Sequence, residues 1–237
     1  MFLRTFSFAA LMLAMAVVTN PASAFIIDSF DDNQLVSADS GTPLDTNSVG
    51  GSMVGGTRRM EALWQSGANS IDAEVNAGSS SLLNVSLGAD TIGEIDVVYD
   101  GGGGGFGPID FTAGSTLNSI AMTIPFDDLP VDIEIIAISL TGESSLQQNP
   151  GGGIFAPVAL PFLFNDFSVL SGTGADFTAI TGLRIIIDPL FPATDLQIDF
   201  IETTFTPPSG VPEPATYVMG AMALAGLGLM IRRKRQG

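Results

Sequence analysis

The chain has 237 residues with 8 Lys and Arg against 25 Asp and Glu, and it contains neither Cys nor His. These absences exclude disulfides, His-dependent catalytic triads, Cys nucleophiles, and zinc sites built from thiolate or imidazole. The net charge of −17 excludes nucleic acid as a partner, because binding to phosphates needs a basic face.

The N-terminus has the three parts of a secretory signal peptide. Arg4 precedes an apolar run over residues 6–18, and a polar stretch then ends in Ala22-Ser23-Ala24. An Ala-x-Ala sequence in this place is typical of a signal peptidase site. We therefore predict a signal peptide over residues 1–24, handled by the Sec translocon and cleaved by signal peptidase after Ala24.

The body, residues 25–202, is predicted to be one acidic domain. Three arginines stand against 24 acidic residues between the two end signals, a net charge of −21. Apolar and polar residues alternate with period two in several short runs separated by Gly and Pro, which indicates strands with one buried face. The fold class is therefore all-β, an antiparallel β-sandwich of about ten strands. The runs are residues 25–30, 71–76, 83–87, 94–99, 109–112, 117–126, 131–135, 159–170, 183–188 and 195–204.

Two segments of the body depart from this alternation. Residues 59–65 are compatible with a turn of helix, and the phase slips at Ile135-Ile136, where a β-bulge is expected.

The C-terminus is a second tripartite signal. A Pro/Thr/Ser-rich linker is predicted over residues 203–211, followed by a tail over residues 212–237. The tail starts with Pro212-Glu213-Pro214, continues with an uncharged apolar segment at 215–231, and ends with the basic residues Arg232, Arg233, Lys234 and Arg235. An apolar helix of this length covers about 25 Å, so residues 215–231 are predicted to be a single transmembrane helix with its basic end in the cytoplasm.

This tail resembles the PEP-CTERM sorting signal of Gram-negative bacteria that make extracellular polysaccharide. The resemblance implies that an exosortase recognises Pro212-Glu213-Pro214 and removes the tail. It also implies a transient stay in the inner membrane, followed by the cell surface or the extracellular space.

The body resembles the galactose-binding-like jelly roll of carbohydrate-binding modules. The resemblance lies in the acidic β segments at its two ends, residues 25–32 and 195–202. It implies that the first and last strands pair and that acidic residues near them hold a structural calcium. Asp28, Asp31 and Asp199 are the candidate ligands, and the alternative is ordinary solvated aspartates.

Carbohydrate contacts are sought among aromatic and cationic side chains. Trp64 is either a core residue or an exposed platform for a sugar ring. Arg58 and Arg59 either pair with acids at the surface or grip an acidic sugar or a partner carboxylate.

The function expected from these features is that of an exported surface or matrix protein with a structural or adhesive role in exopolysaccharide or biofilm. The alternative is a non-catalytic module that binds extracellular polysaccharide. No motif singles out a pair of carboxylates for catalysis, so we expect no enzyme activity.

Overall fold

Sixteen strands and three single-turn 3-10 helices make up residues 24–206, the part of the chain that the computed structural model describes. Residues 24–205 belong to one compact unit. None of the helices within residues 24–206 is long and apolar enough to cross a membrane. The predicted signal peptide up to residue 23 and the predicted helix at 215–231 lie outside the described residues.

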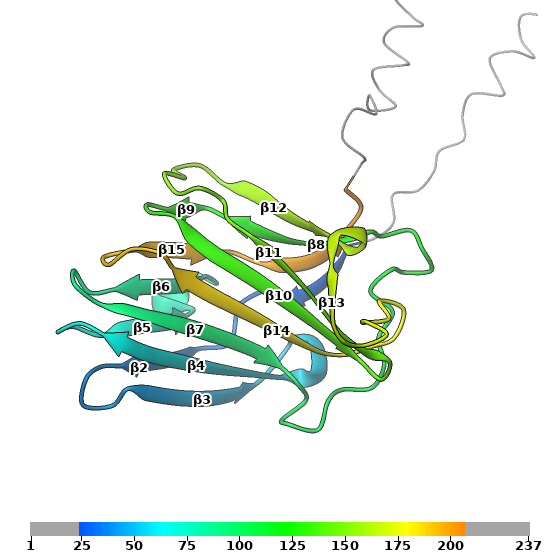
Figure 1. Cartoon of the computed structure of the whole chain (residues 1–237), viewed down its shortest axis with the longest axis horizontal. Coiled ribbons are helices and arrows are strands. Elements are labelled where there is room, and N and C mark those ends of the chain that lie inside the picture. Colours follow the sequence, from blue (N-terminus) through cyan, green and yellow to red (C-terminus); the bar gives the residue numbers. More distant parts are fainter. Residues whose placement is uncertain (1–23, 207–237) are drawn as a thin grey trace, which may run out of the picture. The chain divides into compact units, whose positions relative to one another are not determined.

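One layer of the domain is a seven-stranded antiparallel sheet, in the order β13-β11-β10-β14-β7-β4-β3. Its strands are β3 (Leu44–Gly50), β4 (Thr57–Ser66), β7 (Ile92–Tyr99), β10 (Val131–Ser139), β11 (Gly142–Gln148), β13 (Ser168–Gly172) and β14 (Ile180–Pro189). In Figure 1, β10, β14, β7, β4 and β3 lie side by side across the front of the molecule.

The second layer consists of two sheets. The five-stranded sheet has the order β2-β5-β6-β15-β9, with β2 (Gln34–Ala38), β5 (Ile71–Val75), β6 (Leu83–Leu87), β15 (Asp195–Ile198) and β9 (Phe126–Asp127). The four-stranded sheet has the order β1-β16-β8-β12, with β1 (Phe25–Asp28), β16 (Ile201–Thr204), β8 (Ser119–Ile124) and β12 (Val158–Leu163). Pro125 separates β8 from β9 and Asp199-Phe200 separates β15 from β16, so two chain segments pass from one sheet into the other.

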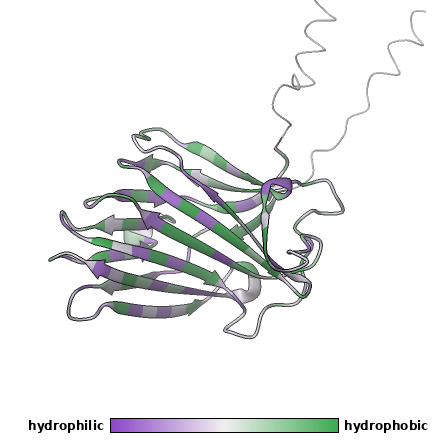
Figure 2. Ribbon diagram, in the orientation of Figure 1, coloured by the Kyte–Doolittle hydropathy of each residue, from purple (hydrophilic) through white to green (hydrophobic). Residues whose placement is uncertain are grey.

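The core lies between the layers and is formed by alternate residues of the strands. In β10, Val131, Ile133, Ile135 and Ala137 are buried, and the residues between them are partly exposed. Figure 2 shows the same alternation of hydrophobic and hydrophilic residues along the other strands of the large sheet. The all-β sandwich predicted from period-two patterning is therefore confirmed.

The termini of the described domain lie together. Strand β1 pairs antiparallel with β16, with Phe25 opposite Thr203 and Asp28 opposite Ile201. This is the pairing that the jelly-roll resemblance implied. Strand β16 continues through Thr204, two residues into the range assigned to the linker.

Two local predictions were wrong. Residues 59–65 are not helical but belong to β4, which pairs with both β3 and β7. The register of β10 passes through Ile135-Ile136 without interruption, and its irregularity lies at Ile138/Ser139. The apparent phase slip at Ile136 arises because this outward-facing position is apolar.

Candidate functional site

The outer face of the seven-stranded sheet carries a dense group of charged side chains, which we call the acidic sheet face. These residues alternate with core residues along β4, β7, β10 and β14, so their side chains point away from the second layer. They are the acids Glu61, Glu94, Asp96, Asp132, Glu134 and Asp188 and the arginines Arg59 and Arg184.

Like charges stand directly opposite each other on this face. Asp132 of β10 pairs in register with Asp188 of β14. Glu61 of β4 pairs in register with Asp96 of β7. Like charges placed opposite each other on neighbouring strands destabilise a sheet, so an arrangement such as Asp132 opposite Asp188 is not explained by the needs of folding.

The centre of the acidic sheet face is sheltered. Asp96 and Val98 point outward from β7, yet their exposed fractions are only 8% and 6%. Beside them is a depression of about 130 Å³, lined by Glu94, Asp132, Glu134, Gln147, Ile186 and Asp188. A ligand in this depression would meet carboxylates from three strands.

Two arginines neutralise part of the negative charge of this face. Arg184 donates from Nε to Asp96 Oδ1 at 2.9 Å and from its second nitrogen to Oδ2, which raises the pKa of Arg184 above its usual value. Arg59 pairs with Glu61 and lies 3.8 Å from Asp100. Asp132, Glu134 and Asp188 have no ion pair within residues 24–206.

Two carboxyl groups of this face hold their protons more tightly than usual. Burial, together with the charges of Asp96 and Asp188, raises the pKa of Glu94. Burial and the charge of Asp132 raise the pKa of Asp188. Both shifts mean that a ligand able to donate hydrogen bonds here would relieve an unfavourable concentration of negative charge.

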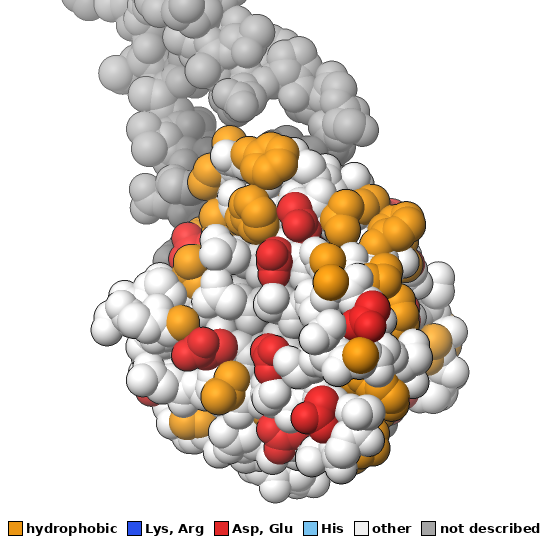
Figure 3. All heavy atoms as spheres, turned by 90° about the vertical axis from the view of Figure 1, so that its left-hand side faces the viewer, with side chains coloured by type: hydrophobic (Ala, Val, Ile, Leu, Met, Phe, Trp, Pro, Cys, Tyr) orange, Lys and Arg blue, Asp and Glu red, His pale blue; other side chains and the backbone are white. Residues whose placement is uncertain are grey.

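Figure 3 shows the adjoining end of the sandwich, where β14 terminates. Acidic side chains are spread over this end among polar and hydrophobic ones, and no Lys or Arg is seen in this view. The acidic character therefore continues beyond the sheet face, which disfavours polyanionic ligands.

The structure separates the two adjacent arginines that the sequence suggested as sugar contacts. Arg59 lies on the acidic sheet face, as a ligand contact requires. Arg58 is completely buried and points between the layers. It donates to Asp28 Oδ2 at 2.7 Å, to Gln34 Oε1 at 2.7 Å and to the carbonyl oxygen of Asp32 at 2.6 Å. The predicted contact between Arg58 and a sugar is therefore wrong, because the guanidinium of Arg58 is buried away from solvent.

The carboxylates suggested as calcium ligands do not come together. Asp28 is buried and accepts hydrogen bonds from Arg58, from Tyr99 Oη at 2.8 Å and from the Phe30 amide at 2.8 Å. Asp31 is exposed and accepts from Ser29 and Ser81, which lower its pKa. Within residues 24–206 no group of three or more acidic side chains is arranged to hold a metal ion, so Asp28, Asp31 and Asp199 do not form the expected set. The guanidinium of Arg58, and not a metal ion, neutralises Asp28.

Trp64 belongs to the inner side of β4. Its ring is partly buried and packs against the core, and its Nε1 is buried without a hydrogen-bond partner within the described residues. The core alternative therefore describes its position better than the platform alternative.

Sequence reasoning did not identify the acidic sheet face, although a signal was present. Glu94 and Asp96, and likewise Asp132 and Glu134, occupy alternate positions in strands that were predicted correctly. Reading the outward positions together would have shown a carboxylate-rich face. The order of the strands, which places these pairs next to each other, could not be read from the pattern.

Comparison with known proteins identifies the tail. Residues 210–235 match the family model of the PEP-CTERM protein-sorting motif. This match confirms the signal that starts at Pro212-Glu213-Pro214, and it marks the chain as an exported protein sorted to the cell envelope. No curated protein matches the chain.

Solved structures with distant likeness include carbohydrate-binding proteins. A family 11 carbohydrate-binding module from Clostridium thermocellum, in complex with a β-1,3-1,4-mixed-linked tetrasaccharide, has a TM-score of 0.39 and 13% identity, covering 77% of this chain and 96% of that one. TmCBM61 in complex with β-1,4-galactotriose has a TM-score of 0.32 and 9% identity, covering 73% and 89%. An exo-β-agarase has a TM-score of 0.38 and 10% identity, covering 78% and 25%. Likeness at this level does not say which residues bind a ligand.

Proposed function

We propose that this exported protein, sorted by its PEP-CTERM tail, binds extracellular polysaccharide without catalysis through the acidic sheet face. The observation that supports the proposal is the placing of Asp132 opposite Asp188, neither with an ion pair within residues 24–206, on a face that the second layer does not cover. Such a pair weakens the sheet, and a ligand that donates hydrogen bonds to it offsets this cost.

The chemistry of the face fits a neutral sugar chain. Carboxylates accept hydrogen bonds from hydroxyl groups, and the guanidinium groups of Arg59 and Arg184 donate to them. Ile136 and Ile186, both partly exposed, lie between the charged side chains and give the apolar faces of sugar rings a surface to pack on. An anionic polymer would meet uncompensated repulsion.

The cellular role that we propose is structural or adhesive. The mature protein would link the cell surface or the matrix to the exopolysaccharide of its own host, after passing through the inner membrane and being processed by exosortase. A protein that only holds polysaccharide needs shape and hydrogen-bonding groups, and the acidic sheet face supplies both.

Binding of the mature protein to a glycan array, together with the extracted exopolysaccharide of the host, tests the proposal. The variants are Asp188→Asn and Glu134→Gln. The control is Asp166→Asn, on the 3-10 helix η3 (Phe164–Asp166), whose side chain makes no ion pair or hydrogen bond within residues 24–206. We expect Asp188→Asn and Glu134→Gln each to weaken binding about tenfold and the control to leave it unchanged. Wild-type binding by both Asp188→Asn and Glu134→Gln would overturn the assignment of the site, and release of reducing ends from the glycan would overturn the non-catalytic role.

A further inference from the structure

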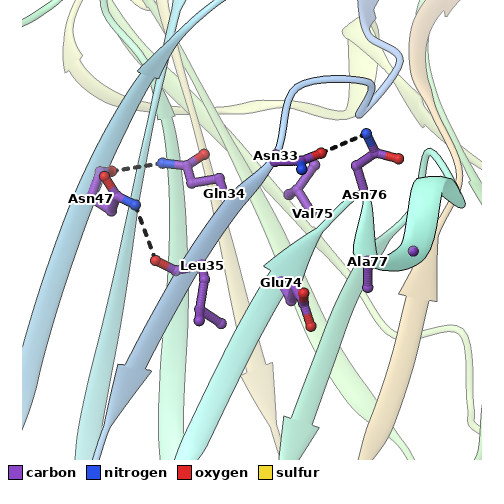
Figure 4. A pocket seen from close by; sticks show the side chains of 9 residues that line it. Asn33, Gln34, Leu35, Asn47, Glu74, Val75, Asn76 and Ala77 are labelled. Atoms are coloured by element: carbon purple, nitrogen blue, oxygen red, sulfur yellow. Dashed lines mark hydrogen bonds between the residues drawn. The ribbon is translucent and has the colours of Figure 1, made fainter.

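A second, chemically different hollow lies on the five-stranded sheet (Figure 4). It has a volume of about 300 Å³, the lower end of the range of about 300–1,000 Å³ typical of small-molecule sites. It is bordered by β2, β3, β5 and the 3-10 helix η2 (Ala77–Ser79). The residues that matter for its chemistry are Asn33, Gln34, Leu35, Asn47, Glu74 and Asn76. We call it the amide groove.

Hydrogen bonds to neighbouring groups fix the orientation of the amide side chains. Asn76 donates from Nδ2 to Asn33 Oδ1 at 2.7 Å and to the carbonyl oxygen of Asp31 at 2.6 Å, and its Oδ1 accepts from the Ser81 amide at 3.1 Å. Figure 4 shows Asn33 and Asn76 pointing toward each other. Asn47 donates from Nδ2 to the carbonyl oxygen of Leu35 at 3.2 Å. None of these amides can turn over without losing a bond.

This fixed orientation leaves a defined set of groups for a ligand. Asn33 Nδ2, Asn47 Oδ1 and the Glu74 carboxylate have no hydrogen-bond partner within residues 24–206. They supply one donor and two acceptors at the border of the groove. Leu35, with 53% of its surface exposed, supplies an apolar patch beside them.

Hydrogen bonds from the interior of the domain hold the wall of the groove in place. Gln34 is buried, and its Oε1 accepts a hydrogen bond from Arg58 Nε at 2.7 Å. Its Nε2 therefore faces β3 and donates to the carbonyl oxygen of Asn47 at 2.7 Å. Asn76 has a left-handed backbone with φ of 60°, a conformation that costs energy in most residues and that Asn tolerates better than most. The groove is consequently held in one shape before any ligand arrives.

We propose that the amide groove is a binding site for a short, neutral, hydroxyl-rich saccharide, separate from the acidic sheet face. Hydroxyl groups donate and accept at once, which matches a site with one donor and two acceptors next to an apolar patch. An anion is disfavoured because no Lys or Arg lines the groove, and a divalent cation because Glu74 is its single carboxylate.

The test uses the mature protein with neutral oligosaccharides, cellotetraose and galactotetraose, and with the host exopolysaccharide after partial hydrolysis. The variants are Asn33→Asp, which replaces the free donor by an acceptor, and Glu74→Gln, which removes the charge. Both side chains are exposed, so both variants are expected to fold. Asn165→Asp, on η3 and without a side-chain hydrogen bond within residues 24–206, is the matched control.

We expect Asn33→Asp to weaken binding of at least one of these saccharides about tenfold, Glu74→Gln to weaken it to a smaller extent, and Asn165→Asp to have no effect. The side-chain amide resonances of Asn33, Asn47 and Asn76 should shift on titration with that saccharide. The variant Asp188→Asn should leave these shifts intact, because Asp188 lies on β14 and does not line the groove.

Two results would overturn the proposal. One is that no saccharide in the set shifts the amide resonances of the groove. The other is that Asn33→Asp binds as tightly as the wild type. If binding is then lost in Asp188→Asn alone, the acidic sheet face remains the site and only the amide groove is rejected.

Discussion

The guanidinium of Arg58 lies 2.7 Å from the carboxylate of Asp28, and neither side chain is open to solvent. Tyr99 donates to the same oxygen of Asp28, and burial raises the pKa of Tyr99 well above its usual value, so the phenol stays protonated. This cluster joins β1 to β4 and β7 through the interior. Through the hydrogen bond from Arg58 to Gln34, the cluster also fixes the orientation of Gln34 at the amide groove.

Arg58→Met is predicted to destabilise the domain strongly, by about 3–5 kcal/mol, because it leaves the Asp28 carboxylate buried and unpaired. The double variant Arg58→Met/Asp28→Asn should recover part of this loss, since no buried charge then remains. Urea denaturation measures both effects. Arg59→Met, which breaks the more exposed pair with Glu61, serves as the comparison and should cost about 1 kcal/mol or less. Equal losses in the two single variants would contradict the assignment.

Asp127→Asn is predicted to stabilise the domain above pH 6. The Asp127 side chain is buried, neither carboxylate oxygen has a hydrogen-bond partner of normal geometry within the described residues, and burial raises its pKa to about 6. The folded state therefore binds the proton more tightly than the unfolded state, and stability falls as the pH rises from about 4 to about 6.

The variant should match the wild type near pH 4 and exceed it by roughly 3 kcal/mol at pH 7.5, since each pKa unit corresponds to about 1.4 kcal/mol. Urea denaturation across this range checks the prediction, with Asp166→Asn as the control. A gain that does not change with pH would show that the Asp127 carboxyl group does not titrate as described.

Asp188→Asn is predicted to stabilise the protein at pH 7.5 while weakening glycan binding. The raised pKa of Asp188 means that its ionisation costs stability as the pH rises above the ordinary range of a carboxyl group. Removing the charge opposite Asp132 should gain about 0.2–1 kcal/mol, the size of a cross-strand pair interaction. Thermal melting at pH 4 and pH 7.5 measures the gain, which should be present only at the higher pH. A loss of stability at pH 7.5 would contradict the view that this pair is kept for binding.

Trp64→Phe is predicted to leave glycan binding unchanged, because Trp64 packs on the inner side of β4. Its stability should stay within about 1 kcal/mol of the wild type, since the lost ring surface is partly offset by removal of an unpaired buried N–H. Loss of binding without loss of stability would contradict this prediction and show that Trp64 contacts the sugar.

Processing at both ends is checked by the intact mass of the protein purified from its host. We expect a chain that starts at Phe25 and lacks the apolar segment at 215–231. Substitution of Pro212-Glu213-Pro214 by three alanines should leave the tail in place and keep the protein in the membrane fraction. A wild-type mass that still includes residues 215–237 would mean that the tail is an anchor.

The limits of prediction from sequence are clearest in β4. Its inward positions are Arg58, Met60, Ala62 and Trp64, and an arginine in the first of them hides the alternation that reveals other strands. Asp28, the partner that makes this arginine acceptable, lies 30 positions earlier in the chain. Regular strands such as β10 were predicted from alternation alone, because every inward residue there is apolar or small.

The acidic sheet face and the amide groove also differ in how much of each could be predicted from the sequence. The acidic sheet face depends on residues that alternate within predicted strands, so only the strand order was missing. The amide groove combines residues 33–35, residue 47 and residues 74–78. Its chemistry depends on which way each amide is turned, and that is decided by contacts between segments that are remote in the sequence.

The pairing of β1 with β16 means that the chain enters and leaves the domain at neighbouring points, with Phe25 opposite Thr203. Strand β16, the partner of β1 in the sheet, is also the last strand of the described domain in chain order, so it is exported after all the others. A chain cut before Ile201 would leave β1 without its partner strand, so completion of the sheet and arrival of the sorting signal are nearly simultaneous events.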